Sequence, residues 1–215
     1  MPNQIIVENW QGGTSDWRIS NPSLAGEIEG FLSMTSALPG ETINFFVSTK
    51  MQSFSIQIFR MGWYGGAGGR LMKTVPMLWG IDQSSVHTID DTFGTVNCTN
   101  WKQSYSLQIP DDWVSGIYLV KLSTGPDAPS LERHMVFVVK SNNSSDLLWV
   151  SPTNTYQAYN GWDGGLGLGA SLYDNFATGS NAGKHVNAVS FNRPYADGLG
   201  AGNFLNWEYP MLFLA

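Results

Sequence analysis

The sequence is short of cysteine and of long apolar runs. Cys98 is the single cysteine, which excludes an internal disulfide and a Cys-x-x-Cys metal site. No apolar run approaches the roughly 20 residues that a membrane-spanning helix needs. The first residues, MPNQIIVENW, lack the basic and apolar regions of a signal peptide. We therefore expect neither a membrane span nor a signal peptide within these 215 residues.

Charge is also scarce. Charged residues make up 13% of the chain, well below the usual quarter. The polar surface must then come from Ser, Thr, Asn, Gln and Gly, a composition that slightly favours an exported protein without fixing its localisation. The 11 basic residues are outnumbered by 17 acidic ones and form no cluster, which disfavours nucleic acid as a partner.

Several common catalytic and binding motifs are missing or misplaced. The three histidines, at positions 87, 134 and 185, lie far apart and form no zinc-binding pattern. No Gly-x-Ser-x-Gly string is present, which disfavours the serine of an α/β-hydrolase. Gly165, Gly167 and Ala170 fit a loose dinucleotide pattern, but they do not directly follow a predicted strand. Zinc, serine and nucleotide chemistry are all disfavoured.

Hydrophobic residues (42%) and aromatic residues (13%) are abundant enough for a packed core. After an N-terminal segment, residues 1–26, the stretch 27–140 alternates apolar and polar residues in the runs 43–48, 54–59 and 104–109, and two further strands are predicted at 118–122 and, from β-branched residues, at 134–139. This period of two predicts strands with one face inward. Strands at this spacing predict an immunoglobulin-like antiparallel β-sandwich. Tyr118 follows a turn, where we expect its hydroxyl to make a corner hydrogen bond.

A different organisation is predicted after residue 140. Residues 141–146, SNNSSD, are typical of a linker. The apolar run 147–150 predicts a strand that is buried on both faces of a parallel sheet, and residues 186–191 a second strand. Residues 204–215 suit a helix limited or kinked by Pro210. Residues 147–215 therefore resemble the beginning of an α/β domain that is incomplete within this chain.

Residues 59–70, FRMGWYGGAGGR, form a glycine-rich string around Trp63 and Tyr64. Neither a Lys-Ser/Thr pair nor a helix follows, so a phosphate cradle is disfavoured. We expect a loop that packs its two aromatic residues against the neighbouring domain.

Tyrosines are concentrated in residues 154–195, among Gly, Asn, Asp and Pro residues that predict loops. The tyrosines in question are Tyr156, Tyr159, Tyr173 and Tyr195. A phenol can stack, donate a hydrogen bond or, once deprotonated by a Lewis acid, bind a metal. Stacking of Tyr156 and Tyr159 on Trp162 is an equally good explanation of the pattern, so the residues alone leave these alternatives open.

A succession of strings resembles one protein family. These strings are FRMGWYGGAGGR, NCTNW, DDWVSGIYLVKL, TYQAYNGW, SLY and VSFNRPY, in this order from about residue 28 onward. The set is similar to the large (beta) subunit of N,N-dimethylformamidase and its relatives. The resemblance implies a sandwich followed by an α/β domain with a glutamine amidotransferase-like fold, as the boundary above also indicates.

The resemblance further implies a mononuclear ferric (Fe3+) site held by two tyrosinates and one glutamate. By motif, the expected metal ligands are Tyr159 of AYN and Tyr195 of RPY, with Tyr156 as the alternative ligand. Asn160, Asp163 and Arg193 are candidates for orienting the ligands. The family's glutamate belongs to a downstream His-x-Glu-Tyr-Trp string that is not present here, and Glu208 is only a superficial match to it. We therefore expect a fragment that lacks one ligand.

The function implied by the resemblance is hydrolysis of a small amide substrate by a metal-dependent amidohydrolase. A small partner subunit and homo-oligomer formation are implied with it. The alternative is a non-catalytic immunoglobulin-like binding or assembly module of an exported or surface protein. Visible colour from a ferric tyrosinate would discriminate between the two.

Overall fold

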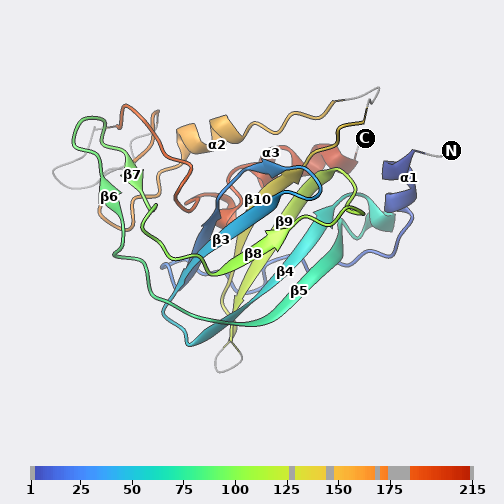
Figure 1. The fold of residues 1–215 in the computed structure, drawn as a ribbon, viewed down its shortest axis with the longest axis horizontal. Helices are drawn as coiled ribbons and strands as arrows, with labels where there is room; N and C mark the ends of the chain where they lie inside the picture. Colours follow the sequence, from blue (N-terminus) through green and yellow to red (C-terminus); the bar gives the residue numbers. More distant parts are fainter. Residues whose placement is uncertain (1–2, 126–128, 144–147, 168–169, 174–184, 214–215) are drawn as a thin grey trace.

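A computed structural model describes residues 3–125, 129–143, 148–167, 170–173 and 185–213 (Figure 1). Over these ranges the protein is mostly β, with a few short helices. No helix among the described residues is long and apolar enough to cross a membrane.

The larger sheet has five strands in the order β2-β10-β9-β4-β5. The pairing is antiparallel except between β2 and β10, which run parallel. The strands are β2 (Ser36–Ala37), β4 (Ser53–Met61), β5 (Gly69–Trp79), β9 (Gly116–Thr124) and β10 (Glu132–Val139).

A second sheet has three antiparallel strands in the order β1-β3-β8. Its strands are β1 (Ile28–Leu32), β3 (Thr42–Thr49) and β8 (Tyr105–Gln108). A separate short ribbon pairs β6 (Thr88–Ile89) with β7 (Val96–Asn97). Each of the five runs predicted as strands overlaps a strand, although β8 is shorter than the predicted run 104–109, so those predictions are confirmed.

The two larger sheets enclose a common apolar core. Alternate residues of β3, including Phe45, are fully buried against alternate residues of β4, including Ile56 and Ile58. This is the layer that the alternation predicted, since every second side chain of a strand points to the same face. Tyr118 lies in this core, and its hydroxyl donates to the carbonyl of Val114 at 2.7 Å. The predicted corner hydrogen bond is confirmed.

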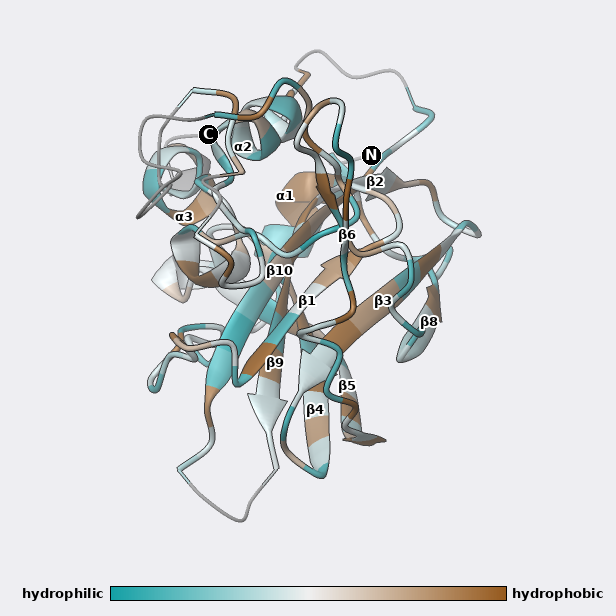
Figure 2. Ribbon diagram, turned by 90° about the vertical axis from the view of Figure 1, so that its left-hand side faces the viewer, coloured by the Kyte–Doolittle hydropathy of each residue, from teal (hydrophilic) through white to brown (hydrophobic). Residues whose placement is uncertain are grey.

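The five-stranded sheet is also covered on its other face. Ile117 and Leu119 of β9 and Phe59 of β4 pack there against the C-terminal part of the chain, whose helices lie over β10 (Figure 2). The covering elements are α2 (Thr153–Tyr159), the 3-10 turn η3 (Gly198–Gly200), α3 (Phe204–Trp207) and the 3-10 turn η4 (Tyr209–Phe213). Because both faces are covered, β9 is buried almost continuously instead of at alternate positions.

Two predicted strands are wrong. Residues 148–150 form no strand, and Leu148 is 88% exposed, while residue 147 lies outside the described residues. Residues 186–191 are also irregular. An apolar run becomes a buried strand only where neighbouring strands can pair with it, and the described residues after β10 contain no strand. The predicted helix over 204–215 is confirmed in shorter form, as α3 and then η4 around Pro210.

The glycine-rich string forms the end of β4, the 3-10 turn η1 (Tyr64–Gly66) and the start of β5. Tyr64 is buried but Trp63 is 51% exposed, and the element that Tyr64 contacts belongs to the N-terminal segment, so the predicted packing of both aromatic residues against the neighbouring domain is wrong. Their neighbour is the N-terminal helix α1 (Gln4–Asn9), whose Glu8 accepts hydrogen bonds from Tyr64 and Arg70 at 2.8 Å. Among the linker residues, 141–143 follow β10 without regular structure and 144–146 lie outside the described part. The domain boundaries stay a prediction.

Candidate functional site

The first two tyrosines of the predicted cluster lie on a helix. Tyr156 and Tyr159 belong to α2, so the prediction that loops carry them is wrong. Tyr156 and Gln157 are buried against the five-stranded sheet, and Asn160, which follows α2, is buried with them. A helix brings residues three and four positions apart to one face, which explains why Tyr156 and Asn160 share this side.

Tyr156 connects two other groups. Its hydroxyl donates a short hydrogen bond to the carboxylate of Glu208, and its ring meets the ring of Tyr195 edge to face, with centroids 6.3 Å apart. Burial raises the pKa of Tyr156, and the adjacent Glu208 carboxylate raises it further because a negative charge disfavours a phenolate. Two phenols and one carboxylate are therefore neighbours.

Tyr195 follows the buried Arg193 and lies partly buried at the surface of α2. Burial raises the pKa of its phenol, while the Gln157 side chain, within hydrogen-bonding reach, and the positive charge of Arg193 both act to lower it. Tyr195 thus has neighbours that favour its ionised form, whereas the neighbours of Tyr156 oppose ionisation.

The backbone around Tyr195 is fixed on both sides by Asn160. The Asn160 Nδ2 donates to the carbonyl of Pro194 at 2.9 Å, and the backbone N–H of Ala196 donates to Asn160 Oδ1 at 3.0 Å. From β10, the Arg133 guanidinium donates to the carbonyl of Tyr195 at 2.8 Å. Tyr195 is therefore positioned by a helix end and by the sandwich together.

Arg193 is fully buried, and each of its five N–H groups faces a backbone carbonyl. The acceptors, at 2.8 to 3.5 Å, are the carbonyls of Gln157, Asn160, Trp162, Ala170 and Ser190. Two of these carbonyls end α2, where helix carbonyls have no partner within the helix. Burial lowers the pKa of Arg193 to about 10, so the side chain is still a cation at neutral pH.

The remaining predicted residues lie apart from this network. The ring of Tyr159 packs on that of Tyr173, with centroids 5.0 Å apart. Asp163 Oδ1 accepts from the backbone N–H of Gly165 at 2.9 Å and so shapes a turn. The structure thus brings Tyr195, Tyr156, Asn160 and Arg193 into one network and leaves Tyr159 with a different ring partner.

Sequence reasoning missed three contributors. Glu208 had a signal, since it lies in a Glu-Tyr string, but that string alone gave no reason to place it beside Tyr156. Gln157 lies within the TYQAYN string and had no separate signal. Arg133 had none, because its position in an ordinary strand does not reveal that it reaches Tyr195.

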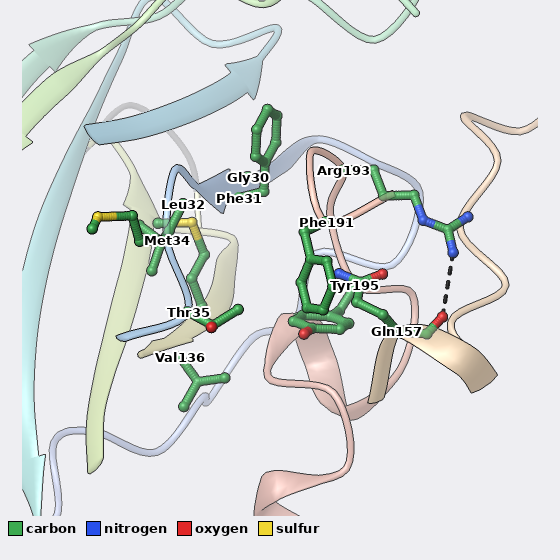
Figure 3. Close-up of a pocket in the computed structure, with 12 residues that line it drawn as sticks. Gly30, Phe31, Leu32, Met34, Thr35, Val136, Gln157, Phe191, Arg193 and Tyr195 are labelled. Atoms are coloured by element: carbon green, nitrogen blue, oxygen red, sulfur yellow. Dashed lines mark hydrogen bonds between the residues drawn. The ribbon is translucent and has the colours of Figure 1, made fainter. Parts of the chain in front are cut away.

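A small cavity lies beside Tyr195, between two walls (Figure 3). Its volume is about 20 Å³. One wall comes from the end of β1 and the chain that follows it, and includes Phe31, Met34 and Thr35; the other includes Gln157, Phe191 and Tyr195. Sequence segments that are more than a hundred positions apart thus share one cavity.

Among the described residues, no group of three or more His, Cys, Asp and Glu side chains is placed to hold a metal ion. Tyrosine, the ligand type that the resemblance implies, is not one of these four residue types. The expected ferric site therefore stays a prediction.

Comparison with known protein families places the chain beside one family model. The family model described as "N,N-dimethylformamidase beta subunit-like, C-terminal" matches residues 55–215, which is most of the chain. No curated protein matches it.

Proposed function

Because the chain belongs to the N,N-dimethylformamidase beta subunit-like family, we propose that it contributes to the hydrolysis of small linear amides at a ferric, tyrosinate-bound centre. Tyr195 is one ligand in this proposal, and the second phenol is Tyr159 by motif or Tyr156 by proximity. The proposal includes the finer fold assignments, an immunoglobulin-like sandwich and the start of an amidotransferase-like domain. It also includes a small partner subunit and oligomer formation.

The observation that carries the proposal is the grouping of Tyr195, Tyr156 and Glu208. Two phenols and a carboxylate are hard oxygen donors, the type that a ferric ion prefers. The ring contact between Tyr195 and Tyr156 and the hydrogen bond from Tyr156 to Glu208 bring these donors together. These contacts support the proposal, and they favour Tyr156 over Tyr159 as the partner of Tyr195.

Burial raises the pKa of both phenols, so both stay protonated at neutral pH in the absence of a cation. When Tyr156 ionises, its proton has an acceptor in place, since its hydroxyl already donates to Glu208. Ionisation of Tyr195 is favoured by Gln157 and by the charge of Arg193. The chain thus holds a proton acceptor for one phenol and a favourable field for the other.

A bound ferric ion would polarise an amide carbonyl and lower the pKa of a bound water. The chain's own residues bind and orient. Asn160 and Arg133 fix the backbone on either side of the Tyr195 side chain, so that its phenol is held in one place. Because the phenol is already held in position, the reaction barrier does not include the entropic cost of orienting it.

The test is the visible charge-transfer band of ferric tyrosinate in the iron-loaded protein. We expect a band in the wild type, its loss or strong reduction in Tyr195→Phe, and a comparable loss in Tyr156→Phe if Tyr156 is the second ligand. Tyr159→Phe is the matched variant, because Tyr159 lies only one helical turn from Tyr156. If Tyr159 is the second ligand, as the motif implies, the band is lost in Tyr159→Phe and not in Tyr156→Phe.

Tyr173→Phe is the control, because Tyr173 has a largely exposed ring and is not a proposed ligand. Iron bound in a colourless protein, or a band that survives all three ligand variants, would contradict the proposal. Amide hydrolysis that persists in Tyr195→Phe would contradict it as well.

A second candidate function is the non-catalytic binding or assembly module. It is favoured by exposed aromatic residues at one place: Trp10 is 72% exposed, and the neighbouring Asn9 side chain accepts a hydrogen bond from the backbone of Trp63. Exposed tryptophans are enriched where proteins bind one another. A protein that takes up no iron but loses self-association or partner binding in Trp10→Ser would support this candidate.

A further inference from the structure

An apolar cluster covers the outer face of the three-stranded sheet, where it joins the sandwich to the C-terminal segment. Its buried members include Phe31 of β1, Trp101 and Trp162. Glu29 precedes Phe31 by two positions on β1 and so points to the same face, where it is only 7% exposed. A carboxylate buried among apolar side chains costs free energy unless it has a partner. The partner of Glu29 therefore indicates what this carboxylate does.

The partner of Glu29 is the indole of Trp162. The Trp162 Nε1–H donates to Glu29 Oε2 at 2.8 Å, and both side chains are buried. The two residues are 133 positions apart in the sequence, and Trp162 lies in the loop that follows α2. Hydrogen bonds to an ionised acceptor are roughly twice as strong as those between neutral groups. The carboxylate thus binds this loop to the sandwich.

The backbone of Trp162 contacts two residues that fix the position of Tyr195. The Trp162 N–H donates to Asn160 Oδ1 at 3.1 Å, and the Trp162 carbonyl accepts from Arg193 Nη1 at 2.9 Å. The same Asn160 Oδ1 accepts from the backbone N–H of Ala196, which directly follows Tyr195. A displacement of the indole would therefore be transmitted to both sides of Tyr195.

Glu29 lies among groups that act on its ionisation. Burial raises its pKa, while the hydrogen bond from Trp162 and the positive charge of Arg133 on β10 act to lower it, and burial prevails. Glu29 is therefore protonated at a higher pH than an exposed glutamate. Further groups that interact with it electrostatically, from the loops after β3, β5 and β7, are Lys50, Asp82 and Cys98.

We propose that Glu29 is a positioning residue for Tyr195: its carboxylate holds Trp162, and with it the loop after α2, and protonation of the carboxylate loosens that hold. Glu29 acts through Trp162 and does not touch the reacting groups. The link is a property of the iron-free chain. Its consequence for catalysis rests on the proposed function, in which Tyr195 is a ligand.

The first test follows the indole N–H of Trp162 by NMR in the whole iron-free chain, with the resonance identified by its absence in Trp162→Phe. Between about pH 8 and about pH 5, we expect a sigmoidal change of its chemical shift in the wild type and a nearly constant shift in Glu29→Gln. Glutamine keeps an oxygen acceptor of the same shape but does not titrate. The same sigmoidal profile in Glu29→Gln would overturn the proposal.

His87 is a second titratable group beside the indole, since its ring meets that of Trp162 edge to face with centroids 6.5 Å apart. His87→Asn removes this group and leaves Glu29 in place. We expect the wild-type pH profile of the Trp162 resonance to persist in this variant. If the profile disappeared in His87→Asn, the proton would be assigned to His87 and the proposal would be overturned.

The second test measures whether the link reaches Tyr195. Amide hydrogen exchange is followed at Trp162 and Ala196, whose N–H groups both donate to Asn160 Oδ1. At the high-pH plateau of the NMR profile, we expect both amides to exchange about fivefold faster in Glu29→Gln, the difference between a charged and a neutral acceptor. Amides of β9 should be unchanged, because the variant leaves the core between the sheets intact.

Glu41→Gln is the matched control, because it removes the same charge from an exposed position of the sandwich. Circular dichroism checks the fold of each variant. Unchanged exchange at Trp162 and Ala196 in Glu29→Gln, or equal acceleration in Glu41→Gln, would overturn the positioning role.

The outcomes also distinguish this proposal from the proposed function, because neither measurement involves iron. A Trp162 profile that depends on Glu29, in a protein that shows no ferric colour when loaded with iron, would support the link and refute the ferric centre. Ferric colour that requires Tyr195, in a chain whose Trp162 profile is independent of Glu29, would do the reverse.

Discussion

The sandwich and the C-terminal segment, residues 148–213, are stabilised in opposite ways. The core that the two sheets share is built from fully buried apolar side chains, such as Phe45, Ile56 and Ile58. In the C-terminal segment, Arg193, Asn160 and Gln157 are buried just as deeply. The difference follows from backbone pairing. Strands satisfy their N–H and C=O groups among themselves, whereas an irregular segment leaves carbonyls that need buried donors.

This contrast bears on function. An apolar core is strong but tolerant, since many side chains can fill similar space. The network around Tyr195 is directional, because Asn160 and Arg133 each bind specific backbone atoms next to it. The segment that carries the candidate site thus has a defined conformation although it contains only short helices and no strand among its described residues.

The largest expected effect comes from a substitution in the apolar core between the two sheets. Phe45→Ala removes a fully buried ring between the two sheets, and we expect a loss of about 4 kcal/mol in the free energy of unfolding. Urea unfolding followed by circular dichroism measures it. We expect the unfolding transition of the whole chain, including the C-terminal segment, to shift to lower urea concentration. A loss below about 1 kcal/mol would show that the sheets do not share a tightly packed core.

A substitution in the buried polar network of the C-terminal segment should have a more local effect. Arg193→Met roughly keeps the volume but removes the guanidinium donor from five backbone carbonyls, of which, among the described residues, only that of Gln157 keeps another bond, from the Asn160 N–H. We expect about 3 kcal/mol of destabilisation, concentrated in α2 and the loops after it. Hydrogen exchange should accelerate in α2 while β9 stays protected. Arg18→Met, at an exposed site, is the control. If Arg193→Met accelerated exchange in β9 as much as in α2, a local role of Arg193 would be contradicted.

The free energy of unfolding should depend on pH through one histidine at the boundary between the two regions. His134 of β10 is fully buried with Nε2 2.8 Å from the Trp17 carbonyl, and burial lowers its pKa to about 4 from the usual 6.5. The unfolded chain therefore binds a proton at a higher pH than the folded protein does. Stability from this group is full above pH 6.5 and falls as the pH drops toward 4, by up to roughly 3 kcal/mol.

The measurement is urea unfolding between pH 7 and pH 5, a range above the titration of most carboxylates. In His134→Gln we expect a much smaller change in unfolding free energy over this range, because glutamine does not titrate and can still donate to the Trp17 carbonyl. Parallel pH profiles of the variant and the wild type would contradict the assignment.

The smallest expected effect concerns a single hydrogen bond inside the apolar region. Tyr118→Phe removes the hydroxyl that donates to Val114 and keeps the ring that stacks on Trp113. We expect a loss of about 1 kcal/mol. Tyr173→Phe, with a largely exposed hydroxyl, should change the unfolding free energy by less than about 0.5 kcal/mol. A neutral Tyr118→Phe would show that water replaces the corner bond.

Prediction from sequence succeeded where local pattern and environment coincide. The period of two in β3, β4 and β8 was sufficient because alternate residues of these strands meet the core. It failed at residues 148–150 and 186–191, where apolar residues suggested strands without any neighbouring strand to pair with. The motif strings pointed to Tyr195, Asn160 and Arg193, and these three do share one network, although their functional roles stay predictions.

The sequence by itself determined the family, the strands of the sandwich and the tyrosines worth testing, because these depend on residue order and short-range periodicity. Only the tertiary structure decided that Tyr195 faces Tyr156 while Tyr159 faces Tyr173, and that Glu208 and Arg133 join the network. The physical reason is that buried hydrogen bonds form between residues many positions apart. Which donors and acceptors meet is set by how the segment packs on β10, and no local pattern contains that information.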